Sequence, residues 1–188
     1  VVSLSAGNPS PEAFPIEEIK EISSRLLEEN PIGVLQYSVT EGYPQLRETL
    51  KEYMKSHHNI GRDFDDILIT TGAQQIMDLA TKSLVNEGDV VITEAPSFIG
   101  SLNTFRSYNA KLVGVKIDDD GMNMEVLEDT LKNNDIKLIY TIPTFQNPSG
   151  ITMSLAKRKK LIELANKYDV IVLEDNPYGD LRFAGEDL

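Results

Sequence analysis

The chain of 188 residues contains no cysteine and no tryptophan, and only two histidines. Without cysteine there is neither a disulfide framework nor a thiolate metal site, which fits a cytoplasmic protein. No apolar run approaches the length of a membrane-spanning helix. Acidic residues outnumber basic ones, and the net charge of −12 argues against nucleic acid or an acidic lipid surface as a partner. We therefore expect no metal, no membrane and no nucleic acid among the ligands of this protein.

Apolar periodicity divides the chain into two patterns. Near the N-terminus it predicts helices, one that begins after Pro15 and ends near Asn30, and one that begins at Pro44. From Asp66 onward, short apolar strands alternate with helices. Five strands are predicted, at residues 67–70, 90–93, 111–115, 137–142 and 170–174. Because helices separate these strands, we predict an α/β fold with three layers, α/β/α, and a mostly parallel sheet.

Polar and turn-forming residues directly follow two of the predicted strands. The strand at 137–142 leads into Asn147 and a Pro-Ser-Gly turn, and the strand at 170–174 leads into Asp175 and, three residues later, Tyr178. Ligands of open α/β sheets bind beyond the carboxyl ends of the strands, so these groups look like one wall of a small-molecule site. Taken singly, each stretch also has a plainer interpretation, a turn in the first case and a helix cap by Asp175 in the second.

Two further strand ends add groups of a different kind. At Thr70-Thr-Gly-Ala-Gln-Gln75, a predicted strand passes through Gly72 into a helix, and the free N–H groups at such a junction bind anions, most often phosphate. Glu94-Ala-Pro-Ser-Phe98 sets an aromatic ring, Phe98, just past another strand end, where a flat ligand could stack on it. Each feature alone is weak, because a glycine also eases a tight turn and most such rings belong to the core. Together, the four strand ends describe a site for a flat, phosphorylated heteroaromatic compound.

This ordered set of motifs resembles the pyridoxal-phosphate-dependent aminotransferases of class I and II, which have the aspartate aminotransferase fold, and especially the branch of 2-aminoadipate and aromatic aminotransferases. The resemblance runs along the whole chain and implies a role for each strand end. Asp175 would pair with the pyridine nitrogen of pyridoxal 5'-phosphate and keep it protonated. Tyr178 and Asn147 would hydrogen-bond its phenolic oxygen, and Phe98 would stack on the ring. The phosphate would be held by three consecutive residues, Gly72, Ala73 and Gln74.

The resemblance also assigns roles to the first part of the chain. Tyr37, in Gln-Tyr-Ser-Val-Thr-Glu-Gly, matches the tyrosine that reaches the phosphate in the other subunit, which implies a homodimer. Gly7, in Ala-Gly-Asn-Pro, matches the glycine beside the α-carboxylate of the substrate, and Asn147 would share that substrate site. We therefore predict an N-terminal segment, residues 1–43, that contributes to the substrate site and the dimer contact. Residues 44–188 would form part of the large cofactor-binding domain, incomplete at its C-terminus.

The lysine that forms the Schiff base in this family follows the Asp-x-x-Tyr motif by some tens of residues, and these 188 residues stop before it. The arginine that clamps the α-carboxylate would lie in the same missing part. We expect both ends of the chain to be cuts rather than natural termini. The resemblance implies an aminotransferase that moves an amino group between an amino acid and a 2-oxo acid by a ping-pong route. We predict that this portion alone is inactive.

Three other interpretations share these motifs. Similar domains are joined to a DNA-binding winged helix in a group of transcription regulators, where they sense a ligand. A C–S lyase that depends on pyridoxal phosphate would use Asp175, Asn147 and Tyr178 equally well. A purely structural interpretation treats every motif as turn chemistry, and it requires five coincidences on one edge of the sheet.

Overall fold

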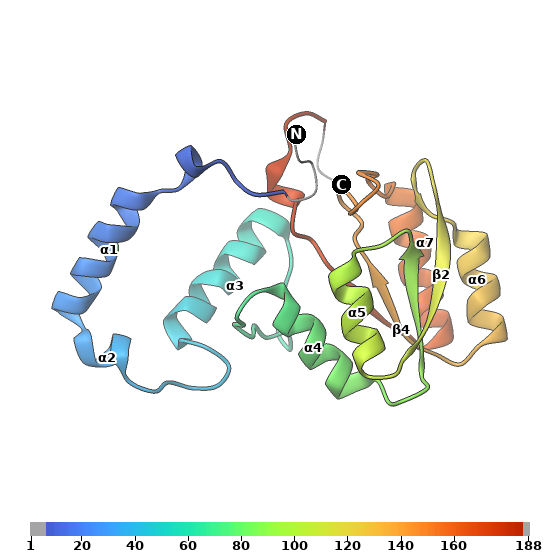
Figure 1. Ribbon diagram of the computed structural model, residues 1–188, viewed down its shortest axis with the longest axis horizontal. Helices are drawn as coiled ribbons and strands as arrows, with labels where there is room; N and C mark the ends of the chain where they lie inside the picture. Colours follow the sequence, from blue (N-terminus) through green and yellow to red (C-terminus); the bar gives the residue numbers. More distant parts are fainter. Residues whose placement is uncertain (1–6, 186–188) are drawn as a thin grey trace, which may run out of the picture. The chain divides into compact units, whose positions relative to one another are not determined.

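The computed structural model describes residues 7–185, and the chain forms two compact units, Val1–Ile69 and Thr70–Leu188 (Figure 1). The sheet lies in the second unit. The segments predicted by function are divided between residues 43 and 44, whereas the two compact units are divided after residue 69. The assignment of residues 44–188 to a cofactor-binding domain stays a prediction.

The sheet of the second unit has five strands in the order β3-β2-β1-β4-β5. Their bounds are Val90–Ala95 for β1, Lys111–Asp118 for β2, Gly121–Met122 for β3, Ile136–Thr141 for β4 and Ile171–Glu174 for β5. All pairs are parallel except β2 with β3, where the chain turns back through a glycine of positive φ, Gly121. The prediction of an α/β fold with a mostly parallel sheet is thereby confirmed.

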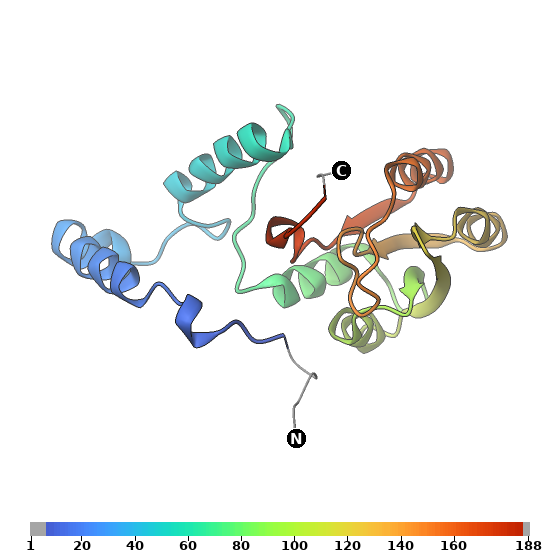
Figure 2. The ribbon, with the colours of Figure 1, turned by 90° about the horizontal axis from the view of Figure 1, so that it is seen from above.

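Helices cover both faces of this sheet, as Figures 1 and 2 show. Helices α4 (Ala73–Leu84) and α5 (Ile99–Ser107) lie on one face, and α6 (Met124–Asn133) and α7 (Leu155–Tyr168) lie on the other. Successive residues of a strand point to opposite faces. In β4, Leu138 and Tyr140 accordingly pack in the core toward α4 and α5, whereas Ile139 packs in the core toward α6 and α7. Apolar side chains on both faces of the sheet are thus buried under helices, which gives three layers, α/β/α.

The first unit is helical in its described part, with η1 (Pro11–Ala13), α1 (Ile16–Glu29), α2 (Pro31–Leu35) and α3 (Pro44–His58). The two helices expected after Pro15 and from Pro44 are confirmed. The short α2 was not predicted; it begins where the Asn30 side chain accepts a hydrogen bond from the Gly33 N–H at 3.1 Å. Within the described part of the chain, every helix is too short or too polar to span a bilayer.

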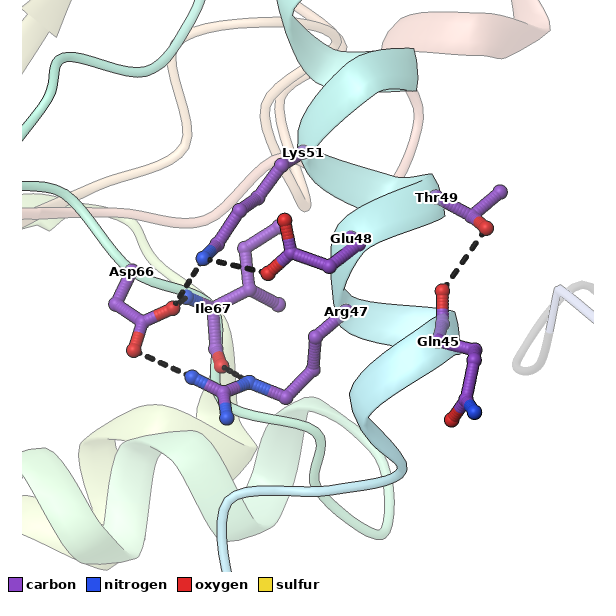
Figure 3. Close-up of polar contacts among 7 residues, drawn as sticks. All are labelled: Gln45, Arg47, Glu48, Thr49, Lys51, Asp66 and Ile67. Carbon is purple, nitrogen blue, oxygen red and sulfur yellow. Dashed lines mark hydrogen bonds and ion pairs between the residues drawn. The ribbon is translucent and has the colours of Figure 1, made fainter.

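The strand predicted at residues 67–70 does not form, and this prediction was wrong. Arg47 of α3 donates from Nε to the Ile67 carbonyl at 2.7 Å and also pairs with Asp66. Lys51 Nζ lies 3.0 Å from Asp66 Oδ1, so two cations of one helix hold this segment (Figure 3). The Ile69 N–H donates to the Glu41 carbonyl at 2.9 Å. A strand needs a neighbouring strand to complete its ladder, and these contacts attach the segment to α3 and the preceding turn instead.

Candidate functional site

The carboxyl ends of β1, β4 and β5 come together at one edge of the sheet. Asp175 directly follows β5, and its backbone N–H donates to the Thr141 carbonyl at the end of β4, at 2.9 Å. Its carboxylate oxygen Oδ2 accepts a hydrogen bond from the Tyr140 hydroxyl at 2.7 Å. Both the backbone and the side chain of Asp175 are therefore held by β4, which fixes the direction of the carboxylate.

Tyr140 itself is held from the other side. Its side chain is fully buried, and its hydroxyl oxygen accepts a hydrogen bond from Ser101 Oγ of α5 at 2.9 Å. The ring of Phe105 meets it edge to face, with ring centres 5.5 Å apart. Burial raises the pKa of the Tyr140 phenol, and the negative charge of Asp175 adds to that shift. The phenol therefore stays protonated and donates to Asp175 throughout the physiological pH range.

The loop after β4 places an amide beside a phenol. Asn147 Nδ2 donates to the Tyr178 hydroxyl at 3.3 Å, and both residues are half-buried. The preceding residue, Gln146, is buried, and its amide braces the loop. Its Nε2 donates to the Pro96 carbonyl at 2.9 Å, while its Oε1 accepts from the Ser149 N–H at 2.8 Å. Asn147 is thus held both by its own hydrogen bond to Tyr178 and by the loop that its buried neighbour braces.

A buried carboxylate, Glu94, ties the end of β1 to the same loop. Its side chain accepts hydrogen bonds from Thr141 Oγ1 at 2.7 Å, from the Ile142 N–H at 3.2 Å and from Gln146 Nε2 at 3.1 Å. Burial raises the pKa of Glu94, and these three hydrogen bonds oppose the shift. Glu94 therefore links two strand ends, at the cost of placing a carboxyl group where water is excluded.

The start of α4 leaves free backbone N–H groups at this edge. Gly72 precedes the helix with φ +77° and ψ 167°, a conformation open essentially to glycine. The first residues of α4, Ala73 and Gln74, carry N–H groups without an intrahelical acceptor, as at every helix start. The Gln74 side chain is held by a hydrogen bond from its Nε2 to Thr104 Oγ1 of α5. The three residues predicted to bind phosphate thus lie at a helix N-terminus that suits an anion.

The ring of Phe98 lies against the first turn of α5, close to Gln74 at the start of α4. Gly100 makes this possible, because a Cβ added there would lie 2.6 Å from Phe98 Cε1 and 3.1 Å from Gln74 Oε1. Phe98 remains 36% exposed, so part of the residue is accessible to a ligand. The predicted stacking ring and the predicted phosphate site therefore share a neighbour.

A small cavity adjoins the phenol of Tyr178. It has a volume of about 370 Å³ and is lined by Phe145, Tyr178, Leu181, Phe183 and Ala184. The guanidinium of Arg182 lies 5.0 Å from the centre of the Phe145 ring. This places mainly apolar surface and one cation beside the polar cluster. Among residues 7–185, no group of three or more His, Cys, Asp or Glu side chains could hold a metal ion.

Two of the predicted site residues lie in the first unit. Tyr37 follows α2 and is fully exposed, and Gly7 is also exposed. The other predicted residues all lie in the second unit. Phe98, Asn147, Asp175 and Tyr178 follow the carboxyl ends of β1, β4 and β5, whereas Gly72, Ala73 and Gln74 lie at the start of α4. The roles of Tyr37 and Gly7 stay predictions.

Sequence reasoning missed Tyr140, Ser101 and Glu94 as parts of the site. The first two are buried residues whose polar atoms pair across elements, and Glu94 is a carboxylate within a buried strand. A signal was present, since a buried polar side chain almost always has a hydrogen-bond partner. That rule predicts that each buried polar side chain has a hydrogen-bond partner, but it does not identify which residue the partner is.

The fold and the site together define an α/β protein with a ligand site at the carboxyl edge of a mostly parallel sheet. The profile of the family "Aminotransferase class I and II" matches residues 1–188. An aromatic-amino-acid aminotransferase of Thermococcus litoralis is 44% identical over 99% of this chain and 46% of its own length. The chain belongs to the class I and II aminotransferase family.

Solved structures agree in fold as well as in sequence. A kynurenine aminotransferase of Pyrococcus horikoshii, solved in complex with PMP, superposes with a TM-score of 0.94 at 42% identity, covering 98% of this chain and 46% of the other. An alpha-aminoadipate aminotransferase of Thermus thermophilus, complexed with N-(5'-phosphopyridoxyl)-L-leucine, gives 0.88 at 36% identity, covering 97% and 46%. The chain thus spans less than half the length of these relatives.

Proposed function

We propose that the complete protein is a pyridoxal-phosphate-dependent aminotransferase that moves an amino group between an amino acid and a 2-oxo acid. The observation that carries this proposal is the placement of Asp175. Its carboxylate is fixed by Tyr140 at the carboxyl end of β5, and the hydrogen-bonded pair of Asn147 and Tyr178 stands on the adjoining loops. The names of the relatives that share this fold support the same reaction.

The residues of the site fit pyridoxal 5'-phosphate in chemistry. A carboxylate suits a protonated pyridine nitrogen, because a charge-assisted hydrogen bond is roughly twice as strong as a neutral one. Since the Tyr178 oxygen accepts from Asn147, its own O–H group can donate to the phenolic oxygen of a pyridoxyl ring. Phe98 would cover one face of that ring. The N-terminus of α4, with Gly72, Ala73 and Gln74, would hold the phosphate.

When bound, pyridoxal phosphate supplies an electron-withdrawing ring that stabilises negative charge at the α-carbon of an amino acid. The contribution of this chain is to bind and orient. Asp175 holds the proton on the ring nitrogen, and Tyr178 and Asn147 hold the ring oxygen. The helix start of α4 fixes the phosphate, so that the ring meets these side chains in one orientation.

We further propose that residues 1–188 do not catalyse transamination by themselves. The chain covers only 46% of the length of its relative from Thermococcus litoralis, and the resemblance to the family implies that the Schiff-base lysine lies beyond the matched region. We propose a homodimer in which Tyr37 reaches the phosphate of the partner subunit's site, and a substrate site that includes Gly7 and Asn147. In this arrangement residues 1–43 contribute to the substrate site and the dimer contact, and residues 44–188 form part of the cofactor-binding domain.

The test is an intact mass measured after incubation with pyridoxal phosphate and reduction with borohydride, followed by peptide mapping. The expected result for the complete protein is one phosphopyridoxyl lysine outside residues 1–188. For residues 1–188 alone, no specific adduct and no transamination are expected. An adduct on one lysine within residues 1–188, or turnover by this portion alone, would contradict the placement of the catalytic lysine outside it.

Product analysis separates transamination from the two related activities. A transaminase converts an amino acid only when a 2-oxo acid acceptor is present, whereas a C–S lyase releases its product without an acceptor. A ligand-sensing regulator would bind pyridoxal phosphate but convert the amino acid neither with nor without a 2-oxo acid. Dependence of product formation on the 2-oxo acid is the result that we expect.

A further inference from the structure

A chain of two hydrogen bonds crosses the core and ends on the residue that would pair with the cofactor nitrogen. Ser101 Oγ of α5 donates to the Tyr140 hydroxyl oxygen at 2.9 Å, and that hydroxyl donates to Asp175 Oδ2 at 2.7 Å. The exposed fractions of Ser101 and Tyr140 are 1% and 0%. The three residues come from α5, β4 and the end of β5, and they meet only in the folded sheet.

The direction of this chain is determined by chemistry. An ionised carboxylate only accepts hydrogen bonds, so the proton between Tyr140 and Asp175 must come from the phenol. The phenol has a single proton, so the bond from Ser101 must be donated by the serine hydroxyl. Tyr140 therefore presents its O–H group to Asp175 in one geometry, and burial prevents water from replacing it.

We propose that Tyr140 is a positioning residue for the cofactor, in that it occupies Oδ2 of Asp175 and leaves Oδ1 directed at the pyridine nitrogen. This inference rests on the proposed function. The terminal torsion of an aspartate is broad, so a carboxylate without such a partner samples many orientations. The hydrogen bond from Tyr140 selects one of them, and the Asp175 N–H bond to Thr141 keeps the backbone in place. Ser101 would act indirectly, because its hydrogen bond holds the phenol of Tyr140 in place.

The test compares two ligands that lack the aldehyde, so that binding does not require a lysine. The first is 4'-deoxypyridoxine 5'-phosphate, and the second is its deaza analogue, in which a C–H group replaces the ring nitrogen. Dissociation constants are measured by calorimetry on the complete apoprotein and on its Tyr140→Phe variant. Removing one hydrogen bond to the charged partner should weaken binding of the first ligand about tenfold. Binding of the deaza analogue should change less than about twofold, because it has no ring nitrogen for Asp175 to meet.

A matched control removes another phenol that is bonded to an aspartate. Tyr108, the C-cap residue of α5, donates to Asp78 Oδ1 of α4 at 2.9 Å, and neither residue is among those proposed to bind the cofactor. Tyr108→Phe should leave both dissociation constants unchanged. Ser101→Ala keeps the Tyr140 ring and should give a smaller loss with the same dependence on the ring nitrogen, and it serves as the test if Tyr140→Phe fails to fold.

The outcomes separate the two proposals. If the unmodified protein binds neither ligand, the proposed function fails, and the role of Tyr140 fails with it. If the unmodified protein binds the pyridine ligand and Tyr140→Phe weakens both ligands equally, Tyr140 only supports the fold, and the positioning role is refuted. An unchanged affinity of Tyr140→Phe for the pyridine ligand would refute it as well. A loss confined to the ligand with a ring nitrogen supports it.

Discussion

Glu94 offers the clearest test of how this site is held together, because one buried carboxylate joins two strand ends. Replacing it with alanine removes the acceptor of the Thr141 hydroxyl and of the Ile142 N–H, and it leaves Gln146 Nε2 with the Pro96 carbonyl alone. An unsatisfied buried donor costs about 1–3 kcal/mol. Since partial relaxation of the loop recovers some of this, Glu94→Ala should lower the free energy of unfolding by about 3–5 kcal/mol.

Glutamine at this position should be far less damaging. The Gln amide oxygen can accept from the Ile142 N–H and from Gln146, while its NH₂ group meets the Thr141 hydroxyl oxygen. Only the hydroxyl proton of Thr141 then loses its acceptor. We expect Glu94→Gln to lower the free energy of unfolding by about 1 kcal/mol, as for one hydrogen bond.

The pH dependence of this difference follows from the raised pKa of Glu94. In the unfolded chain the carboxyl group titrates near its ordinary value of 4.5, and in the folded protein it titrates at higher pH because burial disfavours the charge. The stability contributed by Glu94 is therefore fully present below pH 4.5 and declines as the pH rises through the folded pKa. The advantage of the native protein over Glu94→Gln should be largest below pH 4.5 and should shrink as the pH rises from there through the folded pKa.

The assay is guanidinium chloride unfolding followed by circular dichroism at several pH values, for the native protein and both variants. Glu174→Gln is the control, because Glu174 ends β5 at the same edge of the sheet but is exposed. Its effect should stay within about 0.5 kcal/mol at neutral pH. If the advantage over Glu94→Gln instead grows with rising pH, the three hydrogen bonds outweigh burial, and the folded pKa of Glu94 is lowered rather than raised.

Three further substitutions test other contacts of the site. Gly100→Ala should weaken binding of 4'-deoxypyridoxine 5'-phosphate by roughly tenfold in calorimetry, because the new methyl group displaces the Phe98 ring; unchanged affinity would remove Phe98 from the site. Phe105→Ala removes a fully buried ring that packs on Tyr140 and should cost about 3–5 kcal/mol in chemical unfolding, whereas a loss below about 1 kcal/mol would contradict that packing. Gly72→Ala should cost about 1–3 kcal/mol, since φ is +77°, and a neutral result would show that the helix start can relax.

Local features of the sequence were sufficient to predict the fold class and to place several candidate site residues at one edge of the sheet. The short apolar runs of β1 and β4 are typical of central strands that are covered on both faces, and both strands are mostly buried. The apolar runs of β2 and β5 form their parallel neighbours, which are more exposed. Pro15 and Pro44 mark where helices begin, and a proline does so through its fixed φ and missing N–H. Asn147, Asp175 and Tyr178 could be placed at one edge because strand ends of a parallel sheet point the same way.

Only the tertiary structure decided which polar groups meet. Residues 67–70 have the apolar pattern of a strand, but Arg47 and Lys51 hold Asp66 and Ile67 against α3, and no local pattern reveals that competition. Strand order, β3-β2-β1-β4-β5, results from packing on two faces and brings β4 between β1 and β5. That order places Tyr140 beside Asp175 and Glu94 beside Thr141. Hydrogen bonds across strands depend on which strands are neighbours, and the local apolar pattern predicted four of the strands but not which of them are neighbours.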